Sequence, residues 1–257
     1  QLKGLASTMP INIADLYGIA EAAGALGIKK DDISDFTETI ALIGTTTDVT
    51  TEAAASALGH MTSLFDLAGE DFSRVAATLV DLGNKGASTE AEIIALTERM
   101  AGAASIAGLS TEETLGLAAA IANVGIEAEA GGSAFSRIFG KVGLLITENK
   151  GLVEEWAEVA GLSTEEFRRA WDVDAAGTFT RILQRLGDMD KGARNTALAM
   201  MGITGVRDRD LILRLSKSET AIGNVTNALD VSSGAWDENT AHLVEAGKRF
   251  ATTGSKI

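Results

Sequence analysis

The sequence has no cysteine and a single proline, Pro10, in 257 residues. Without cysteine, disulfide bonds and thiol chemistry are excluded, and a structural zinc site is strongly disfavoured. One proline among 28 glycines is typical of helices that end at glycines, and it argues against a β-sandwich. Aromatic residues make up only 5% of the chain. A core built mainly from alanine, leucine, isoleucine and valine therefore requires helices that approach one another closely.

Basic residues are also few, with 22 Lys and Arg against 36 Asp and Glu and a net charge of −14. This balance argues against binding to a nucleic-acid backbone, specific or not, because such binding needs a basic face. The longest uncharged runs, 53–65 and 114–126, are shorter than the roughly 18 apolar residues of a membrane span. The chain opens on Gln1 without a signal peptide, so we expect a piece of a longer protein.

Motifs for catalysis and ligand binding each fail at a required position. The Gly-Lys pairs at 140–141 and 247–248 lack the hydroxyl residue of a phosphate-binding loop. Phe135 stands where a nucleophile elbow needs glycine, and Gly192 occupies a ligand position of a calcium-like loop. The acidic pairs Asp172 with Asp174 and Asp208 with Asp210 are interpreted as solvated helix starts. We therefore predict no enzyme and no catalytic, cofactor or metal residue, and we interpret His60 as a partly buried structural histidine.

Apolar residues recur at helical spacing along nearly the whole chain, and no segment alternates strictly enough for a strand. The predicted fold is all-α, an irregular bundle of short helices joined by glycine-containing turns. The expected helices cover 12–26, 30–43, 50–68, 71–84, 89–107, 110–124, 127–147, 151–160, 163–171, 175–187, 191–201, 207–230 and 235–252.

Two identical six-residue segments, 108–113 and 161–166, combine a helix stop with a helix start. In each, glycine suits the left-handed end of one helix, and serine with glutamate three residues later forms a capping box for the next. Residues 27–32 are a looser copy, and Thr89 with Glu92 forms another capping box. Short joints of this kind predict consecutive helices that fold back on one another.

The sequence divides weakly into three parts. We expect a helical region over 1–149, a continuation of it or a small subdomain over 150–216, and a C-terminal helix over 217–257 that leads out of the domain. The first boundary is placed near 149–151, where an amphipathic helix ends. The second is placed near 216–219, after which the sequence becomes polar and poor in large apolar residues.

The segment 127–146 combines small residues with an apolar stripe. Small side chains at 128–134 allow another helix backbone to come close. The stripe that follows consists of Phe135, Ile138, Phe139, Val142 and Leu145. It is interpreted first as intramolecular core, with a seam between identical subunits as the main alternative. A membrane-inserting amphipathic helix is a third alternative, weakened by the few basic residues nearby.

Several of these segments resemble the core region of phage tail tape measure proteins. The resemblance is carried by ASIAGLSTEE at 104–113, LAAA at 117–120, VGIEAEAGGSAF at 124–135, and the upstream segments 22–28, 36–42 and 87–93. It is clearest over roughly 12–147 and weaker beyond. The matching pieces are helix joints and alanine-rich faces, and their order and spacing make the match fairly specific.

This resemblance implies a structural protein of the virion, situated in the tail lumen or at the tail tip. Such proteins set tail length and take part in DNA ejection, when the host envelope becomes a further location and the host membrane a partner. The implied partners also include other copies of the chain, the tail tube, distal tail and baseplate hub proteins, and tail assembly chaperones. Two alternatives stay open, a membrane-active module that forms a DNA passage and a domain associated with cell-wall hydrolysis.

Overall fold

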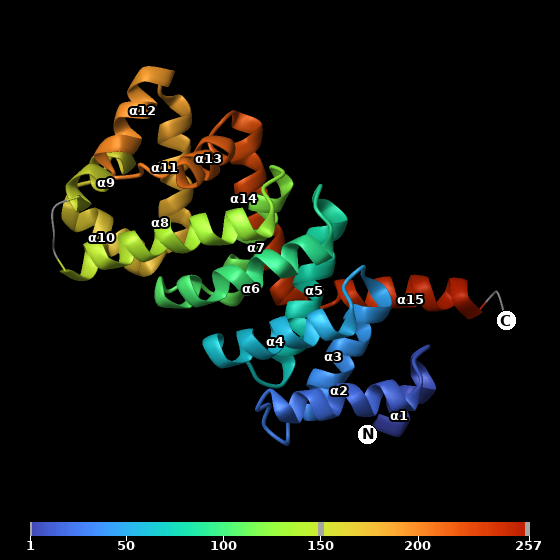
Figure 1. Ribbon diagram of the computed structural model, residues 1–257. Helices are drawn as coiled ribbons and strands as arrows, with labels where there is room; N and C mark the ends of the chain where they lie inside the picture. The colour runs from blue at the N-terminus through green and yellow to red at the C-terminus, as the bar shows by residue number, and fades with distance from the viewer. Residues whose placement is uncertain (1, 149–151, 255–257) are drawn as a thin grey trace.

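A computed structural model describes residues 2–148 and 152–254 (Figure 1). These residues form fifteen α-helices and no strand, which confirms the all-α prediction. The helices are α1 (Leu2–Thr8), α2 (Ile13–Ala25), α3 (Ile33–Thr46), α4 (Thr51–Phe65), α5 (Glu70–Lys85), α6 (Glu90–Ile106), α7 (Thr111–Asn123), α8 (Ala128–Glu148), α9 (Val153–Ala160), α10 (Thr164–Val173), α11 (Ala175–Asp188), α12 (Lys191–Met200), α13 (Val206–Leu215), α14 (Glu219–Glu238) and α15 (Ala241–Gly254).

The two identical joints form as predicted. Gly108 and Gly161 have φ angles of +79° and +67°, a conformation that glycine adopts without a steric penalty. Ser110 and Ser163 cap the helices that follow, and both make reciprocal capping boxes. The looser joint at 27–32 differs, because the Asp32 side chain does not cap α3 and instead accepts a hydrogen bond from the backbone N–H of Gly69 at 3.3 Å.

The helices form an elongated molecule with three parts (Figure 1). Helices α1–α4 and α15 lie towards one end, α9–α13 gather at the other, and α5–α8 with α14 lie between them. One hydrophobic core runs through all three parts, from Leu16 of α2 through Met100 of α6 to Phe179 of α11. The predicted boundary at 149–151 lies outside the described residues.

Small residues bring α8 and α6 together, as the sequence indicated. A Cβ atom on Gly131 would lie 2.8 Å from Ile121 Cγ2 and 3.0 Å from Leu96 Cδ2. A Cβ atom on Gly132 would lie 2.6 Å from Arg99 Cβ. The first turn of α8 therefore packs on α6 at a distance that only glycine permits.

The C-terminal part departs from prediction. The expected helix over 207–230 is wrong, because the chain breaks after Leu215, and Ser218 caps α14 by accepting from the Ala221 N–H. Helix α14 does not lead out of the domain; it turns back and packs against α5 and α7. Its buried face is a stripe of mostly small residues, namely Ala221, Val225, Ala228, Ser232 and Ala235. Helix α15 then lies on α3 and α5.

Candidate functional site

The predicted apolar stripe of α8 lies inside the chain's own core. Phe135, Ile138, Phe139 and Val142 are buried, and Leu145 is partly buried against the same core. The rings of Phe135 and Phe139 stack with centroids 4.0 Å apart. Phe139 also meets Trp171 of α10 and Phe179 of α11 at 5.2 and 5.0 Å. In this conformation the stripe binds α10 and α11, so a partner subunit would reach it only if these helices moved.

Three of the acidic residues singled out in the sequence, Asp174, Asp208 and Asp210, serve as a helix cap or as ion-pair partners. The interpretation of Asp172 as a helix start is wrong, because it lies in the last turn of α10. Asp174 caps α11 and Asp190 caps α12 by accepting backbone N–H groups. Asp208 accepts two hydrogen bonds from the Arg137 guanidinium at 2.6 and 2.9 Å, which ties α13 to α8. Asp210 pairs with Arg214 one turn later at 3.0 Å. Within the described part of the chain, no group of three or more acidic or histidine side chains is placed to hold a metal ion.

The two histidines differ sharply in burial. The prediction of a partly buried His60 is wrong, since its side chain is 58% exposed and lies 3.0 Å from Glu98 across the α4–α6 contact. His242, at the start of α15, is only 3% exposed. The apolar neighbours of His60 in sequence misled the prediction, because this residue occupies the outer face of α4.

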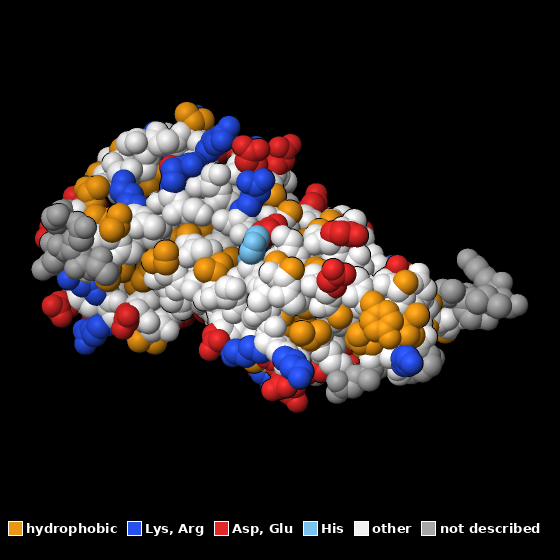
Figure 2. Space-filling view, turned by 60° about the horizontal axis from the view of Figure 1, so that its bottom comes forward, with side chains coloured by type: hydrophobic (Ala, Val, Ile, Leu, Met, Phe, Trp, Pro, Cys, Tyr) orange, Lys and Arg blue, Asp and Glu red, His pale blue; other side chains and the backbone are white. Residues whose placement is uncertain are grey.

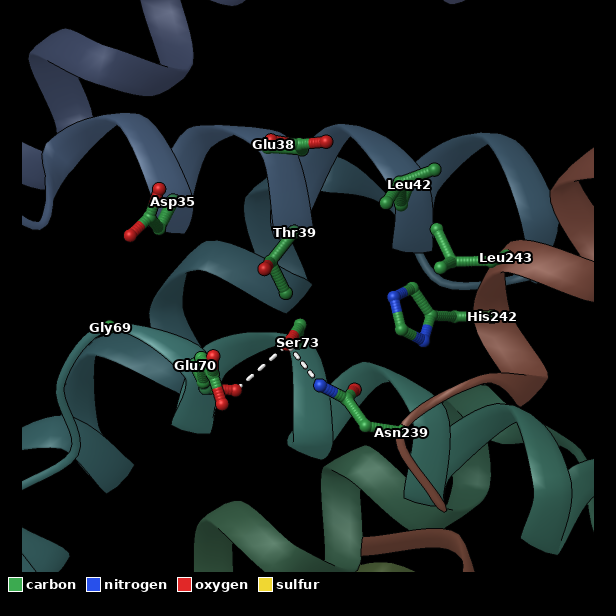
Figure 3. A pocket seen from close by; sticks show the side chains of 10 residues that line it. All are labelled: Asp35, Glu38, Thr39, Leu42, Gly69, Glu70, Ser73, Asn239, His242 and Leu243. Atoms are coloured by element: carbon green, nitrogen blue, oxygen red, sulfur yellow. Dashed lines mark hydrogen bonds between the residues drawn. The ribbon is translucent and has the colours of Figure 1, made fainter. Parts of the chain in front are cut away.

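The main candidate site is a cavity of about 300 Å³ between α3, α5 and the junction of α14 with α15 (Figure 3). Helix α3 contributes Asp35, Glu38, Thr39 and Leu42, the start of α5 contributes Gly69, Glu70 and Ser73, and the junction contributes Asn239, His242 and Leu243. Figure 3 shows His242 and Leu243 projecting from α15 towards Leu42 of α3. The three walls come from segments about 30 to 200 residues apart in sequence, so sequence periodicity alone could not have identified the site.

A left-handed residue shapes the junction. Asn239 has a φ of +49° and ends α14, a conformation that asparagine tolerates better than most residues. Its Nδ2 donates to Ser73 Oγ at 2.8 Å, and the Ser73 hydroxyl donates to the Glu70 backbone carbonyl at 2.8 Å. These bonds fix the start of α15 against α5. They also direct the Ser73 hydroxyl hydrogen to a backbone carbonyl oxygen.

Burial sets the ionisation of two groups that line the cavity. It lowers the pKa of His242 to about 4, so the imidazole is neutral near pH 7. It also raises the pKa of the Glu38 carboxyl, and the negative charge of Asp35 one turn earlier adds to this effect. The His242 Nδ1 and Asn239 Oδ1 atoms are buried without a hydrogen-bond partner. The cavity is therefore acidic on the α3 side and presents a neutral imidazole on the α15 side.

The outer surface carries its hydrophobic side chains in small groups. On the face in Figure 2 these groups alternate with charged side chains. The exposed large hydrophobic residues include Ile13 and Tyr17 on α2, Leu144 on α8, and Val173 and Val206 farther along the chain. No helix in the described ranges combines the length and the apolar character needed to cross a membrane.

Comparison with known proteins gives two matches. The sequence model of a family described as phage-related minor tail proteins matches residues 1–202. The chain is also similar to a probable tape measure protein of Halomonas phage phiHAP-1, with 28% identity over 71% of this chain and 22% of that protein. The chain thus spans about a fifth of the length of this curated relative. No solved structure matches the chain.

Proposed function

The chain belongs to the phage-related minor tail protein family, and we propose that it forms a compact folded element of a tape measure protein, separate from the part that measures length. Membership of this family gives the chain a structural role in the tail and a place in the virion. The family is not a known class of enzyme.

The observation that supports this proposal is the folding back of short helices. The longest helix among the described residues, α8, has 21 residues and is therefore about 32 Å long. A continuous helix of 257 residues would instead span about 390 Å. Because several pairs of consecutive helices pack against each other, among them α2 with α3, α6 with α7 and α10 with α11, this element would add little to the length of an extended protein.

We place this element at the tail tip, where it would anchor the extended remainder of a tape measure protein. Its partners there would be other copies, distal tail proteins and the baseplate hub, with assembly chaperones engaged earlier. The net charge of −14 supports a position that avoids direct contact with the DNA backbone. As the resemblance implies, the whole protein would set tail length and take part in DNA ejection.

Tail-length measurement on two deletion phages tests the proposal. One deletion removes residues 2–254, and the other removes an equal number of residues from a continuous helical part of the full-length protein. We expect the second deletion to shorten tails by about 1.5 Å per residue. The first should block tail assembly or leave the length of the assembled tails nearly unchanged. Proportional shortening by the first deletion would contradict the proposal, as would a virion density map that places this element along the tube.

A further inference from the structure

One imidazole lies on the buried face of α15. His242, Ala246 and Phe250 follow one another at a spacing of four residues, which places them on one face of the helix. His242 and Ala246 are buried, and Phe250 is partly buried against the core. Leu243 and Val244, on the outer face, are each 54% exposed. A titratable ring therefore occupies a position at which the other inward side chains of α15 are apolar.

The surroundings of His242 cannot accommodate a charged ring. Its Nδ1 atom is buried and has no hydrogen-bond partner. Protonation would put a hydrogen on both ring nitrogens, so Nδ1 would become a buried donor without an acceptor. The ring would also carry a buried charge, which costs much more free energy than the same charge in water. Binding of a proton to His242 therefore opposes the packing of α15.

The carboxylates on the facing helices do not compensate this charge. Asp35 and Glu38 of α3 and Glu70 of α5 line the cavity beside His242 (Figure 3). Burial nevertheless lowers the pKa of His242 to about 4, without an offset from these groups. Burial, with the charge of Asp35, also raises the pKa of Glu38, so protonation of Glu38 favours the packed form. Release of α15 in acid would therefore have to come from His242.

The acidic group on α15 itself is already paired. Glu245 lies 3.1 Å from Arg249 and 3.5 Å from Lys248. The hydrogen bond from Arg249 and the charge of Lys248 lower the pKa of the Glu245 carboxyl. This carboxylate therefore stays ionised in mild acid and leaves His242 as the group that responds.

The attachment of α15 allows it to separate from the rest of the molecule. Its main contacts are with α3 and α5, and Figure 1 shows it at the edge of the fold. Asn239, at the turn between α14 and α15, has a left-handed φ of +49°. The hydrogen bond from Asn239 to Ser73 lies on the α14 side of this turn. It can therefore persist while α15 moves.

We propose that α15 is an acid-released helix, which detaches from α3 and α5 about the turn at Asn239 when His242 binds a proton, while the rest of the chain stays folded. Release uncovers Leu42, which is buried and faces His242 and Leu243 in the packed form. This device goes beyond the proposed role in the tail and does not depend on where the element lies in the virion.

Cysteine labelling tests the proposal. The chain has no cysteine, so A246C places a single thiol on the buried face of α15. Its labelling rate with an aromatic disulfide reagent is divided by the rate of a short peptide that carries the same cysteine at the same pH. Where opening is fast compared with labelling, this ratio follows the fraction of molecules in which α15 is detached.

Two histidine variants isolate the group responsible. Between pH 7 and pH 5, the corrected rate of A246C should rise about 20-fold relative to the same change in A246C/H242Q, because an amide does not bind the proton. A246C/H60Q is the matched control and should behave like A246C, since His60 is exposed and lies at the α4–α6 contact. A rise of equal size in A246C/H242Q overturns the proposal.

A118C distinguishes release of α15 from unfolding of the whole chain. Ala118 is fully buried on α7, in the middle part of the molecule. At both pH values A118C should label at least about tenfold more slowly than A246C, because α15 opens while α7 stays packed. Equal corrected rates would show that α15 leaves only when the whole chain unfolds, and the proposal would then fail.

NMR of the wild-type histidines gives a test without substitution, which decides the matter if H242Q by itself frees α15 at pH 7. The ring signal of packed His242 should stay that of a neutral imidazole between pH 7 and pH 5, whereas the exposed His60 serves as the titrating reference. A packed His242 that takes up a proton with a midpoint near pH 6.5 overturns the proposal, because its charge would then be tolerated with α15 in place.

Discussion

Gly116 of α7 lies directly against Ser232 of α14. A Cβ atom at position 116 would be 2.6 Å from Ser232 Oγ, 3.0 Å from the Ala228 carbonyl oxygen and 3.2 Å from Leu229 Cα. Two of these three atoms belong to the backbone, which cannot rotate away as a side chain can. The two helices therefore touch almost backbone to backbone, and their contact depends on a glycine on one side and a stripe of small residues on the other.

G116A should destabilise the protein by about 1 to 3 kcal/mol, because the added methyl group must push α14 away from α7. Urea denaturation measures the free energy of unfolding. G140A is the matched control, since Gly140 lies within α8 and a Cβ atom there meets nothing within 4 Å. That change should stabilise the protein by about 0.5 to 1 kcal/mol through helix propensity. Equal effects of the two substitutions would show that the α7–α14 contact is looser than described.

W156F should be among the more costly single substitutions at the α9 end of the molecule. Trp156 is fully buried, and its indole N–H donates to the Met201 carbonyl oxygen at 3.1 Å. Phenylalanine leaves that acceptor unpaired and a gap beside it, at a cost of about 2 to 3 kcal/mol. W236F is the comparison, because Trp236 is half-buried and its ring contacts Arg74 at 6.0 Å, which phenylalanine partly preserves. Its cost should stay below about 1 kcal/mol.

The glutamates of the two identical capping boxes should have pKa values that are shifted in opposite directions. Hydrogen bonds from Ser163 lower the pKa of the exposed Glu166 carboxyl. Burial raises the pKa of Glu113, and this effect outweighs the bonds from Ser110. Glu166 therefore contributes stability that is lost as the pH falls through its folded pKa. Glu113 contributes stability at low pH that is lost as the pH rises. NMR titration of the glutamate carboxyl carbons should place Glu113 above and Glu166 below the ordinary glutamate value; the reverse order would refute the burial difference.

Acid should loosen the contact of α15 with α3 and α5. The pKa of His242 is about 4 in the folded protein and about 6.5 in an unfolded chain. Because the folded pKa is lowered, the stability that neutral His242 contributes is present above pH 6.5 and is lost as the pH falls towards 4. Between pH 7 and pH 5 the loss should be about 2 kcal/mol.

H242Q isolates this effect from the carboxyl groups that face the same cavity, Asp35, Glu38 and Glu70. The raised pKa of Glu38 acts in the opposite sense, because protonation of this carboxyl is favoured in the folded protein. The measurement is therefore the difference in unfolding free energy between wild type and H242Q at pH 7 and at pH 5. An imidazole of His242 that titrates near pH 6.5 in the folded protein would contradict the prediction.

Local signals predicted the helix joints well and the long-range arrangement poorly. Capping boxes at Thr89, Ser110 and Ser163 form where the sequence placed them, because a cap depends on residues three positions apart. Helix α14 was misread because its buried face consists of alanine, valine and serine, which carry little hydrophobic signal. The spacing of that face, 221, 225, 228, 232 and 235, was present in the sequence but was hidden by the absence of large residues.

The cavity was beyond prediction for a different reason. Glu38 lies in a segment that resembles tape measure proteins, but no motif marked it as a site residue. His242 is not part of any motif. The walls meet because α15 folds onto α3 and α5, and this contact depends on the turn at Asn239. Asparagine followed by a polar residue at the end of a long helix is a signal for such a turn. It does not say which surface the next helix will meet.

The position of α14 between α5 and α7 has a consequence for synthesis. Helix α5 ends at Lys85 and α14 begins at Glu219, so the ribosome makes more than a hundred residues before the surface that α14 covers can close. At ordinary elongation rates this delay is on the order of ten seconds. During it, the nascent chain exposes apolar faces of α5 and α7 with nothing of its own to cover them. A chain that terminates after α7 and before α14 would keep these faces of α5 and α7 exposed. Such truncated products should aggregate or be degraded.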